Sequence, residues 1–230
     1  MTQQLLLGVG LRDDSTFEDY YFGANAQIEN VLYDAVQEKE QSFVYLWAQP
    51  GLGKSHLLQA CCHLAAGVQR SSLYLPLSDL PSLSPDMFDG LEAVDVVCID
   101  GLEPVAGDRD LEVALFDCYN RLRDAGKTLI VSANAAPAAL GCVLPDLVSR
   151  LSWGLTFHLT PLTDNDKKSA LLLRAGRRGF ELPDEVATYI LKYSVRDNKA
   201  LFEILDKLDY ASLAEQRKLT IPFVKEVIFT

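Results

Sequence analysis

Residue types that bind phosphate and Mg²⁺ follow one another in a short glycine-rich turn. Residues 51–55 are GLGKS, between an apolar run at 43–47 and a helical pattern of apolar residues that ends at Gly67. In such a turn the backbone N–H groups surround phosphate oxygens, Lys54 supplies a positive charge, and the Ser55 hydroxyl can ligate Mg²⁺. The pattern predicts a P-loop. Ala48 stands where the motif usually has its first glycine, and the alternative is a chance Gly-Lys-Ser turn.

A carboxylate that could hold the metal ends a second apolar run. Asp100 follows the run 94–99, and an apolar strand that closes on aspartate is typical of a Walker B motif. The alternative is an ordinary aspartate at a strand end. Many hydrolytic P-loop ATPases carry a second acid at the next position, but Gly101 stands there. Glu103 would face the site only if the loop folds back. The pattern therefore predicts nucleotide binding with slow intrinsic hydrolysis.

Two further polar residues lie where strands and helices end. Asn134 follows the apolar run 129–132 and could reach a γ-phosphate or a lytic water, although a turn asparagine fits equally well. Arg150 is expected at the end of a helix, at the rim of the sheet. An arginine there can reach into a neighbour's nucleotide site as a finger. The alternative for Arg150 is a solvated or salt-bridged surface residue.

These residues fall on the expected elements of an α/β fold. Five apolar runs separated by helical patterns predict the strands of a parallel sheet with helices on both faces. The runs are 43–47, 72–75, 94–99, 129–132 and 155–159. After Pro161 only helical patterns occur, and four helices are expected in a small all-α unit. The predicted division is a tail at 1–12, an α/β domain at 13–160 and a helical domain at 161–230.

Composition excludes several classes of protein. Residues 1–160 carry 9 Lys/Arg against 21 Asp/Glu, which argues against extensive direct contact with DNA, whereas residues 161–230 carry 12 against 11. The five cysteines have no C-x-x-C spacing and are expected to be reduced thiols in a cytosolic protein. The three histidines have no metal-site spacing. No run approaches the roughly 20 apolar residues that a membrane-spanning helix needs.

The N-terminal residues 4–9 are mostly apolar and precede a charged segment. Such a tail can dock into a groove on a partner protein. The alternatives are a strand packed on its own domain and a frayed end.

Taken together, these residues resemble the AAA+ module of the bacterial replication initiator DnaA, and most closely the Hda family of DnaA-related regulatory inactivators. The resemblance spans nearly the whole chain. It rests on the segments TFEDYY at 16–21, PGLGKSHLL at 50–58, CID at 98–100, SRLSWGLT at 149–156, RGFELP at 178–183 and QRKLTIPFVKE at 216–226. QLLL at 4–7 is similar to the family's sliding-clamp-binding motif.

The resemblance implies a site and a mechanism. Members of the family bind ADP, dock on the β sliding clamp loaded on DNA, and stimulate hydrolysis of the ATP bound to DnaA. The implied clamp contacts are Gln4, Leu5, Leu7 and Val9. The implied nucleotide contacts are Phe17, Tyr20 and Tyr21 near the base, then Pro50, Gly51, Leu52, Gly53, Lys54, Ser55 and His56, with Asp100 and Ser55 on Mg²⁺. Arg150 matches the arginine finger that acts in trans, and Asn134 falls at the sensor I position.

The sequence departs from the DnaA pattern at several positions. Besides Ala48 and Gly101, Lys199 stands where a sensor II arginine is usual, with Arg196 three residues earlier. A lysine lacks the bidentate fork of arginine, so sensing of a γ-phosphate through this position is weakened. The chain is also expected to lack the helix-turn-helix domain with which DnaA reads DNA.

Three functions follow as hypotheses. The first is a cytoplasmic negative regulator of replication initiation that holds ADP or ATP with Mg²⁺, contacts DNA only through the clamp and acts on DnaA. The second is an autonomous AAA+ ATPase, such as a loader or remodelling motor. The third is a binding module in which nucleotide is structural. Oligomeric state is left open, with a homo-oligomer as one possible partner arrangement, and a membrane partner is not expected.

Overall fold

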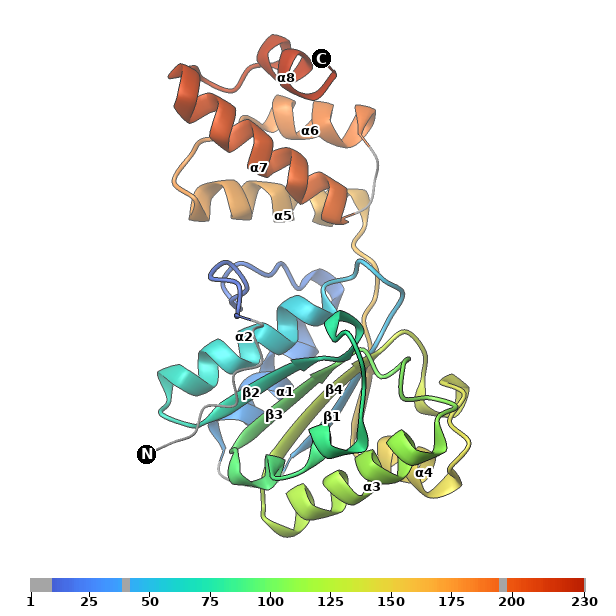
Figure 1. Ribbon diagram of the computed structural model, residues 1–230. Helices are drawn as coiled ribbons and strands as arrows, with labels where there is room; N and C mark the ends of the chain where they lie inside the picture. Colours follow the sequence, from blue (N-terminus) through green and yellow to red (C-terminus); the bar gives the residue numbers. More distant parts are fainter. Residues whose placement is uncertain (1–9, 39–41, 195–197, 230) are drawn as a thin grey trace. The chain divides into compact units, whose positions relative to one another are not determined.

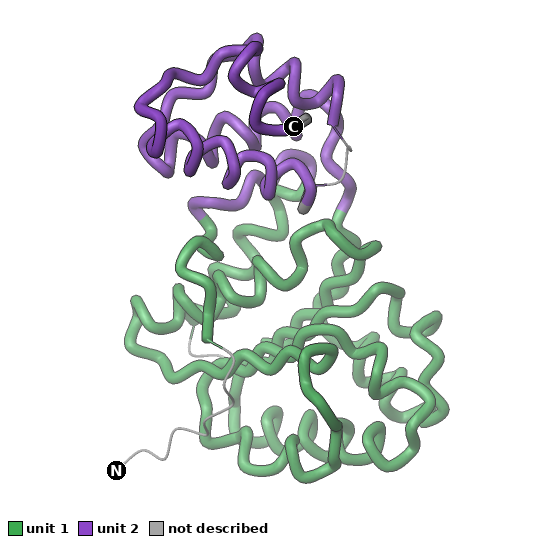
Figure 2. The backbone as a smooth tube through the Cα atoms, turned by 45° about the horizontal axis from the view of Figure 1, so that its top comes forward, with its two compact units in different colours: residues 1–17, 25–159 green, residues 18–24, 160–230 purple. Residues whose placement is uncertain are grey.

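The computed structural model describes residues 10–38, 42–194 and 198–229 in two compact units. One unit comprises residues 1–17 and 25–159, and the other comprises residues 18–24 and 160–230 (Figure 2). Residues 18–24 therefore pack with the C-terminal helices, although the predicted division placed them in the α/β domain. Among the described residues, no helix is both long enough and apolar enough to cross a membrane.

The first unit is built on a five-stranded parallel sheet, as predicted. Its strands, in the spatial order β2-β3-β4-β1-β5, are β1 (Phe43–Trp47), β2 (Ser72–Pro76), β3 (Val96–Asp100), β4 (Thr128–Ala133) and β5 (Leu155–His158). The register sets Trp47 opposite Ala133 and Ile99 opposite Val131. The carboxyl ends of β1, β3 and β4 thus meet at one edge of the sheet, which is where ligand sites form in such folds.

Helices cover both faces of this sheet, as Figure 1 shows, with α1 and α2 on one side and α3 and α4 on the other. Their bounds are α1 (Ala26–Gln37), α2 (Lys54–Gly67), α3 (Arg109–Asp124) and α4 (Pro145–Trp153). Short 3-10 turns complete the unit at η2 (Leu77–Asp79), η3 (Pro85–Phe88), η4 (Leu91–Ala93) and η5 (Pro137–Ala139), and η1 (Gly23–Asn25) crosses the boundary between the two units in the sequence. The central strands are buried on both faces, which explains their nearly continuous apolar sequence.

One strand begins later than its sequence predicts. The run 94–99 led us to expect a strand from Val94, but β3 begins at Val96. Asp95 lies just before the strand, where its carboxylate accepts hydrogen bonds from the Ser71 N–H (3.0 Å), the Ser71 hydroxyl (2.7 Å) and the Lys127 ammonium (2.8 Å). These bonds hold the pKa of Asp95 well below its usual range. Asp95 therefore ties together the residues that precede β2, β3 and β4.

The C-terminal unit is all-α and encloses its own apolar core. Its helices are α5 (Asp164–Arg177), α6 (Asp184–Tyr193), α7 (Asn198–Glu215) and α8 (Ile221–Phe229). Thr163 caps α5 in a reciprocal box with Asp166, as the acidic first turn predicts. Val186, Leu205 and Phe223 are fully buried at the centre of the unit.

Candidate functional site

The P-loop turns sharply at two glycines and runs straight into α2. Gly51 and Gly53 have φ of +83° and +88°, a region in which side chains with a Cβ are strained, and Gly53 caps the N-terminus of α2. The backbone N–H groups of the first turn of α2 are therefore available for a ligand at the carboxyl edge of the sheet. A helix N-terminus reached through such a turn is an anion site.

Lys54 is held at the centre of this turn. Its side chain is only 8% exposed, and its ammonium donates to the Ala48 carbonyl (2.7 Å), the Gln49 carbonyl (3.2 Å) and Asn134 Oδ1 (2.9 Å). Burial lowers the pKa of Lys54, and the nearby carboxylates of Glu103 and Asp100 oppose that shift. The ammonium is thus preorganised where the loop would hold phosphates.

The alanine that replaces the first P-loop glycine has a structural role. Ala48 is fully buried, and its N–H donates to the Ala133 carbonyl at 3.1 Å, so the pairing of β1 with β4 continues one residue beyond the strand. Its own carbonyl accepts from Lys54. The turn therefore starts after Ala48, whose methyl group is buried within the fold.

Asp100 lies buried at the end of β3 with both carboxylate oxygens engaged. Ser132 donates its hydroxyl to Oδ1, and the Tyr74 hydroxyl donates to Oδ2 at 2.7 Å. Burial raises the pKa of Tyr74, and the neighbouring side chains of Ser55 and Gln59 oppose that shift. The two predicted Mg²⁺ ligands, Ser55 and Asp100, are therefore both neighbours of the Tyr74 hydroxyl. A hydroxyl and a carboxylate placed together suit Mg²⁺. Tyr74 was not found from the sequence, because a strand tyrosine looks like a core residue.

Glu103 is the second acid of this site. Sequence reasoning allowed this only if the loop folds back, and it does: Gly101 has φ of +78°, and Glu103 Oε1 accepts the Asn134 N–H. Asn134 therefore joins Glu103, through its backbone, to Lys54, through its side chain. The loop fold depends on a single positive φ, which explains why spacing along the chain left the direction of Glu103 open.

The residues expected near the base fall in both units. Phe17 is buried and packs against Tyr33 with ring centroids 4.6 Å apart. His56, predicted as a nucleotide contact, has Nε2 2.7 Å from the Thr16 carbonyl oxygen. This contact fixes the segment before Phe17 against α2.

Tyr20, Tyr21 and Lys199 belong to the other unit. Tyr20 lies edge-on to Phe22 at 4.7 Å, and Lys199 lies in the first turn of α7. Arg196, the other sensor II candidate, and the tail residues Gln4, Leu5, Leu7 and Val9 lie outside the described residues.

Arg150 lies in the last turn of α4, as predicted, among three aromatic rings. Its guanidinium carbon is 6.0, 5.9 and 6.0 Å from the ring centroids of Phe116, Tyr119 and Trp153. We call these three residues the aromatic cradle. Within residues 10–38, 42–194 and 198–229, Arg150 makes no hydrogen bond or ion pair. Cation–π contacts therefore hold its position and leave its five N–H donors for another partner.

The cradle is fixed to the sheet at Phe43. The Phe43 ring meets Tyr119 edge-on at 5.0 Å, and a Cβ on Gly154 would come within 2.4 Å of the Phe43 carbonyl oxygen. Only glycine can follow Trp153 at this distance from β1. Trp153 itself is 68% exposed, an unusual state for so large an apolar side chain.

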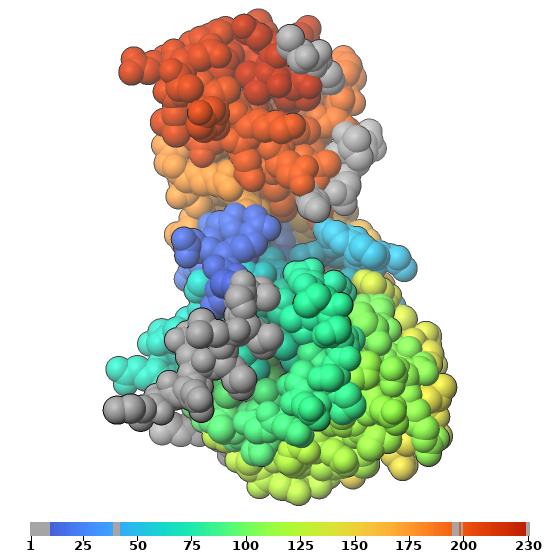
Figure 3. All heavy atoms as spheres, in the orientation of Figure 1, coloured from blue at the N-terminus to red at the C-terminus, as the bar shows by residue number. Residues whose placement is uncertain are grey.

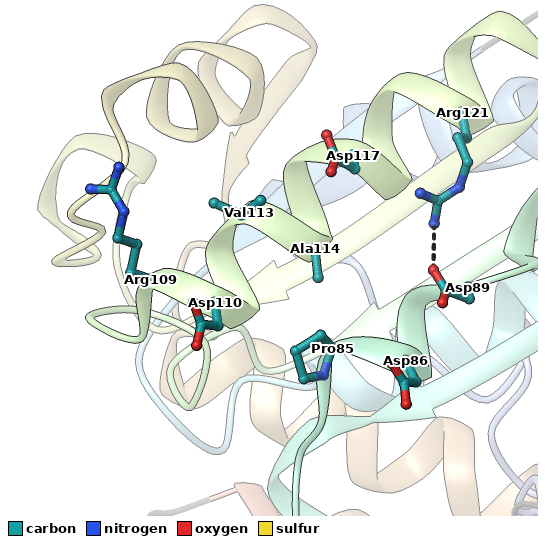
Figure 4. A pocket seen from close by; sticks show the side chains of 9 residues that line it. All are labelled: Pro85, Asp86, Asp89, Arg109, Asp110, Val113, Ala114, Asp117 and Arg121. Atoms are coloured by element: carbon teal, nitrogen blue, oxygen red, sulfur yellow. Dashed lines mark hydrogen bonds and ion pairs between the residues drawn. The ribbon is translucent and has the colours of Figure 1, made fainter.

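A separate hollow lies between η3 and α3 and contains none of the predicted site residues (Figure 4). Its volume is about 410 Å³, and it is lined by charged side chains such as Asp86, Arg109 and Asp117. An ion pair between the Arg121 guanidinium and the Asp89 carboxylate, 3.4 Å apart, crosses the hollow. The segments that line it are coloured green to yellow-green in Figure 3. In the described ranges, no cluster of three or more His, Cys, Asp or Glu side chains is arranged to hold a metal.

Two family models match separate parts of the chain. The model described as bacterial DnaA ATPase domain matches residues 86–158, from η3 to the end of β5. The model described as Hda, lid domain matches residues 164–228, which form the four C-terminal helices. The first range includes Asp100, Glu103, Asn134 and Arg150, whereas the P-loop precedes it.

Solved structures share the fold over nearly the whole chain. Domain III of the Thermotoga maritima initiation protein DnaA has a TM-score of 0.80 at 22% identity, covering 96% of this chain and 98% of that one. AMPPCP-bound DnaA from Aquifex aeolicus has a TM-score of 0.68 at 19% identity, and the match covers 90% of this chain and 70% of that one. The Holliday junction branch migration motor RuvB of T. maritima has a TM-score of 0.69 at 16% identity, and the match covers 93% of this chain and 71% of that one. The fold is that of AAA+ proteins.

Proposed function

Because the chain is a Hda/DnaA-like AAA+ protein and a DnaA-related replication regulator, we propose that it inactivates DnaA. In this proposal it holds ADP or ATP in its own P-loop, docks on the β sliding clamp, and stimulates hydrolysis of the ATP bound to DnaA. It meets DnaA in the cytoplasm and contacts DNA through the clamp.

Adenine nucleotide binding is supported by the geometry around Lys54 and by the neighbours. The helix N-terminus, Lys54 and the Ser55–Asp100 pair are the parts that hold phosphates and Mg²⁺ in P-loop proteins. A DnaA structure of the same fold contains AMPPCP. Bound Mg²⁺ would neutralise phosphate charge, with Ser55 and Asp100 as its protein ligands.

The position of Arg150 and its lack of an ion pair within the described residues are the main support for the proposed function. Its guanidinium makes no ion pair within the described residues, yet three rings hold it in place. It also lies on the α3–α4 face of the sheet, whereas the chain's own P-loop opens α2 on the other face (Figure 1). An arginine that is positioned but unpaired, away from its own phosphates, suits a finger that stabilises charge on a partner's transferring phosphoryl group.

Clamp docking rests on the sequence of the tail. Gln4 would hydrogen-bond the rim of a groove that Leu5, Leu7 and Val9 fill. The double change Gln4→Ala with Leu7→Ala should abolish co-elution with clamp-loaded DNA and leave ADP affinity unchanged, because the P-loop does not involve the tail. The double variant Thr2→Ala with Gln3→Ala is the matched control. A double variant at 4 and 7 that still co-elutes would give the tail another role.

Glu103 favours the autonomous ATPase as a second candidate, because it brings a second carboxylate to the phosphate site. Purified protein alone is nevertheless expected to turn over ATP far below the roughly 1–10³ s⁻¹ typical of enzymes. Steady-state turnover above about 1 s⁻¹ that is abolished by Asp100→Ala would support the ATPase candidate over the regulator.

A further inference from the structure

A buried carboxylate lies where the two helices that form the aromatic cradle begin. Glu112 is in the first turn of α3 and is fully buried, although glutamate is almost never fully buried unless it is paired. Within the described part of the chain, Glu112 forms no ion pair with a cation. A buried anion without a counter-ion must be stabilised by hydrogen-bond donors instead.

The donors to Glu112 are three backbone N–H groups from two separate loops. Oε1 accepts the Gly107 N–H at 2.7 Å and the Val143 N–H at 2.9 Å, and Oε2 accepts the Leu144 N–H at 2.6 Å. Gly107 precedes α3, whereas Val143 and Leu144 directly precede α4. One side chain of α3 therefore holds the segment from which α4 begins.

The N-terminus of α4 has no capping side chain of its own. Leu144 is the N-cap residue and has no side-chain acceptor, and Pro145 at the first helical position has no N–H. Glu112 supplies what is missing, because it fixes the two residues before Pro145 and places a negative charge at the positive end of the helix dipole. The start of α4 is thus set by a residue of α3.

The same two helices bring Arg150 to its three rings. Phe116 lies one turn after Glu112 on α3 and is followed by Tyr119, whereas Arg150 and Trp153 belong to α4. The Arg150 guanidinium carbon is 5.9 Å from the Tyr119 ring centroid and 6.0 Å from each of the other two. Cation–π attraction is significant only within about 6 Å. A small shift of α4 against α3 would therefore weaken the contacts that hold Arg150.

We propose that Glu112 is a positioning residue for Arg150: its carboxylate fixes the start of α4 against α3 and so holds the guanidinium where it acts on a partner's phosphates. The inference rests on the proposed finger role of Arg150 and names the residue that sets its geometry. The rate effect of a finger depends on its placement, because a displacement of about 1 Å can cost about 10² in rate.

Glu112→Gln tests the carboxylate and keeps the shape of the side chain. A carboxamide has a single acceptor oxygen beside an NH₂ group, so at least one of the three N–H groups would face another donor. The maximal stimulation of ATP hydrolysis on DnaA should fall about tenfold, as expected for a displaced catalytic group. The half-saturating concentration, the affinity for ADP and clamp binding should stay at their wild-type values, which separates misplacement of the finger from loss of docking.

Asp108→Ala is the matched control for stability. Asp108 caps the same end of α3 by accepting the N–H groups of Asp110 and Leu111, and it makes no hydrogen bond to α4. Loss of this cap should lower the temperature of thermal unfolding, as Glu112→Gln does, but should leave stimulation of DnaA at the wild-type value. Stimulation that falls in both variants in proportion to their loss of stability would overturn the inference.

Fluorescence of Trp153 reports on the aromatic cradle without any partner. The chain has two tryptophans, so Trp47→Phe leaves Trp153 as the only indole. In that background Glu112→Gln should change the emission and the anisotropy of Trp153, whereas Asp108→Ala should not. An unchanged Trp153 spectrum in Glu112→Gln, or stimulation of DnaA by this variant at the wild-type rate, would overturn the inference alone. Stimulation by Arg150→Ala at the wild-type rate would instead overturn the proposed finger on which the inference rests.

Discussion

Replacing Lys54 by alanine should weaken binding of ADP and ATP at least tenfold. Lys54 is buried in the turn and its ammonium is held there by three hydrogen bonds, so the substitution removes a positive charge from the place where the loop would hold phosphates. Alanine is an excellent helix former, and the first turn of α2 should persist. The loss should therefore fall on ligand affinity rather than on the fold.

The magnitude follows from the three bonds that the ammonium makes. In the protein alone, it donates to two carbonyls and to Asn134 at 2.7–3.2 Å. Binding a phosphate exchanges one or more of these for a charge-assisted bond, which contributes roughly 1.5–3 kcal/mol. Deleting the ammonium also leaves the carboxylates of Asp100 and Glu103 to repel the phosphates. A tenfold loss is about 1.4 kcal/mol, just below this range, and is therefore the minimum that we expect.

Calorimetric titration with ADP and with AMPPCP measures the effect. Lys127→Ala is the matched control, because Lys127 pairs with Asp95 at the opposite end of the strands. The control should bind both nucleotides as the wild type does. Affinity of Lys54→Ala equal to that of the control would refute the assignment of the turn as a P-loop.

Two further predictions concern the aromatic cradle around Arg150 and the amino-terminal edge of the sheet at Asp95. Trp153→Ala should lower the maximal stimulation of ATP hydrolysis on DnaA several-fold, because Arg150 loses one of its three cation–π contacts, while the half-saturating concentration should stay unchanged. Trp153→Phe should restore most of the stimulation. An equal loss in both variants would mean that the ring does not position the arginine. Asp95→Asn should cost about 1 kcal/mol of unfolding free energy at pH 7, since the carboxylate is partly exposed and salt-screened. The folded-state pKa of Asp95 is lowered, so its contribution is present above the unfolded pKa near 4 and is lost as the pH falls toward the folded value. Denaturant titrations of wild type and Asp95→Asn should therefore converge on acidification, and a constant difference down to low pH would contradict the assigned cause.

The fold could be predicted because each element is locally consistent. The run 43–47 is apolar and bounded by turns, and it is β1 to the residue. Thr163 and the acidic residues after it signal the start of α5 correctly. The alternation of strands and helices allows few sheet topologies, because parallel strands require helical crossovers.

The site could be predicted only in part, because its remaining members are brought in by tertiary contacts. Tyr74 reaches Asp100 across neighbouring strands, and nothing in the sequence around it signals that hydroxyl. Glu103 depends on the positive φ of Gly101. The cradle around Arg150 combines Phe116 and Tyr119 of α3 with Trp153 of α4, and an aromatic spacing of three on a helix looks the same whether it serves a core or a cation. Chain spacing cannot reveal such contacts.

The central claim is that Arg150 acts on the nucleotide of DnaA. The measurement is release of ADP from labelled DnaA–ATP in the presence of clamp-loaded DNA. Arg150→Ala should fold, bind nucleotide and bind clamp as the wild type does, yet fail to accelerate hydrolysis, since arginine fingers contribute about 10³–10⁵ in rate in GTPase systems. Arg150→Lys should rescue little, because a compact ammonium cannot span two phosphate oxygens. Stimulation by Arg150→Ala at the wild-type rate would contradict the account and favour a module in which nucleotide is only structural.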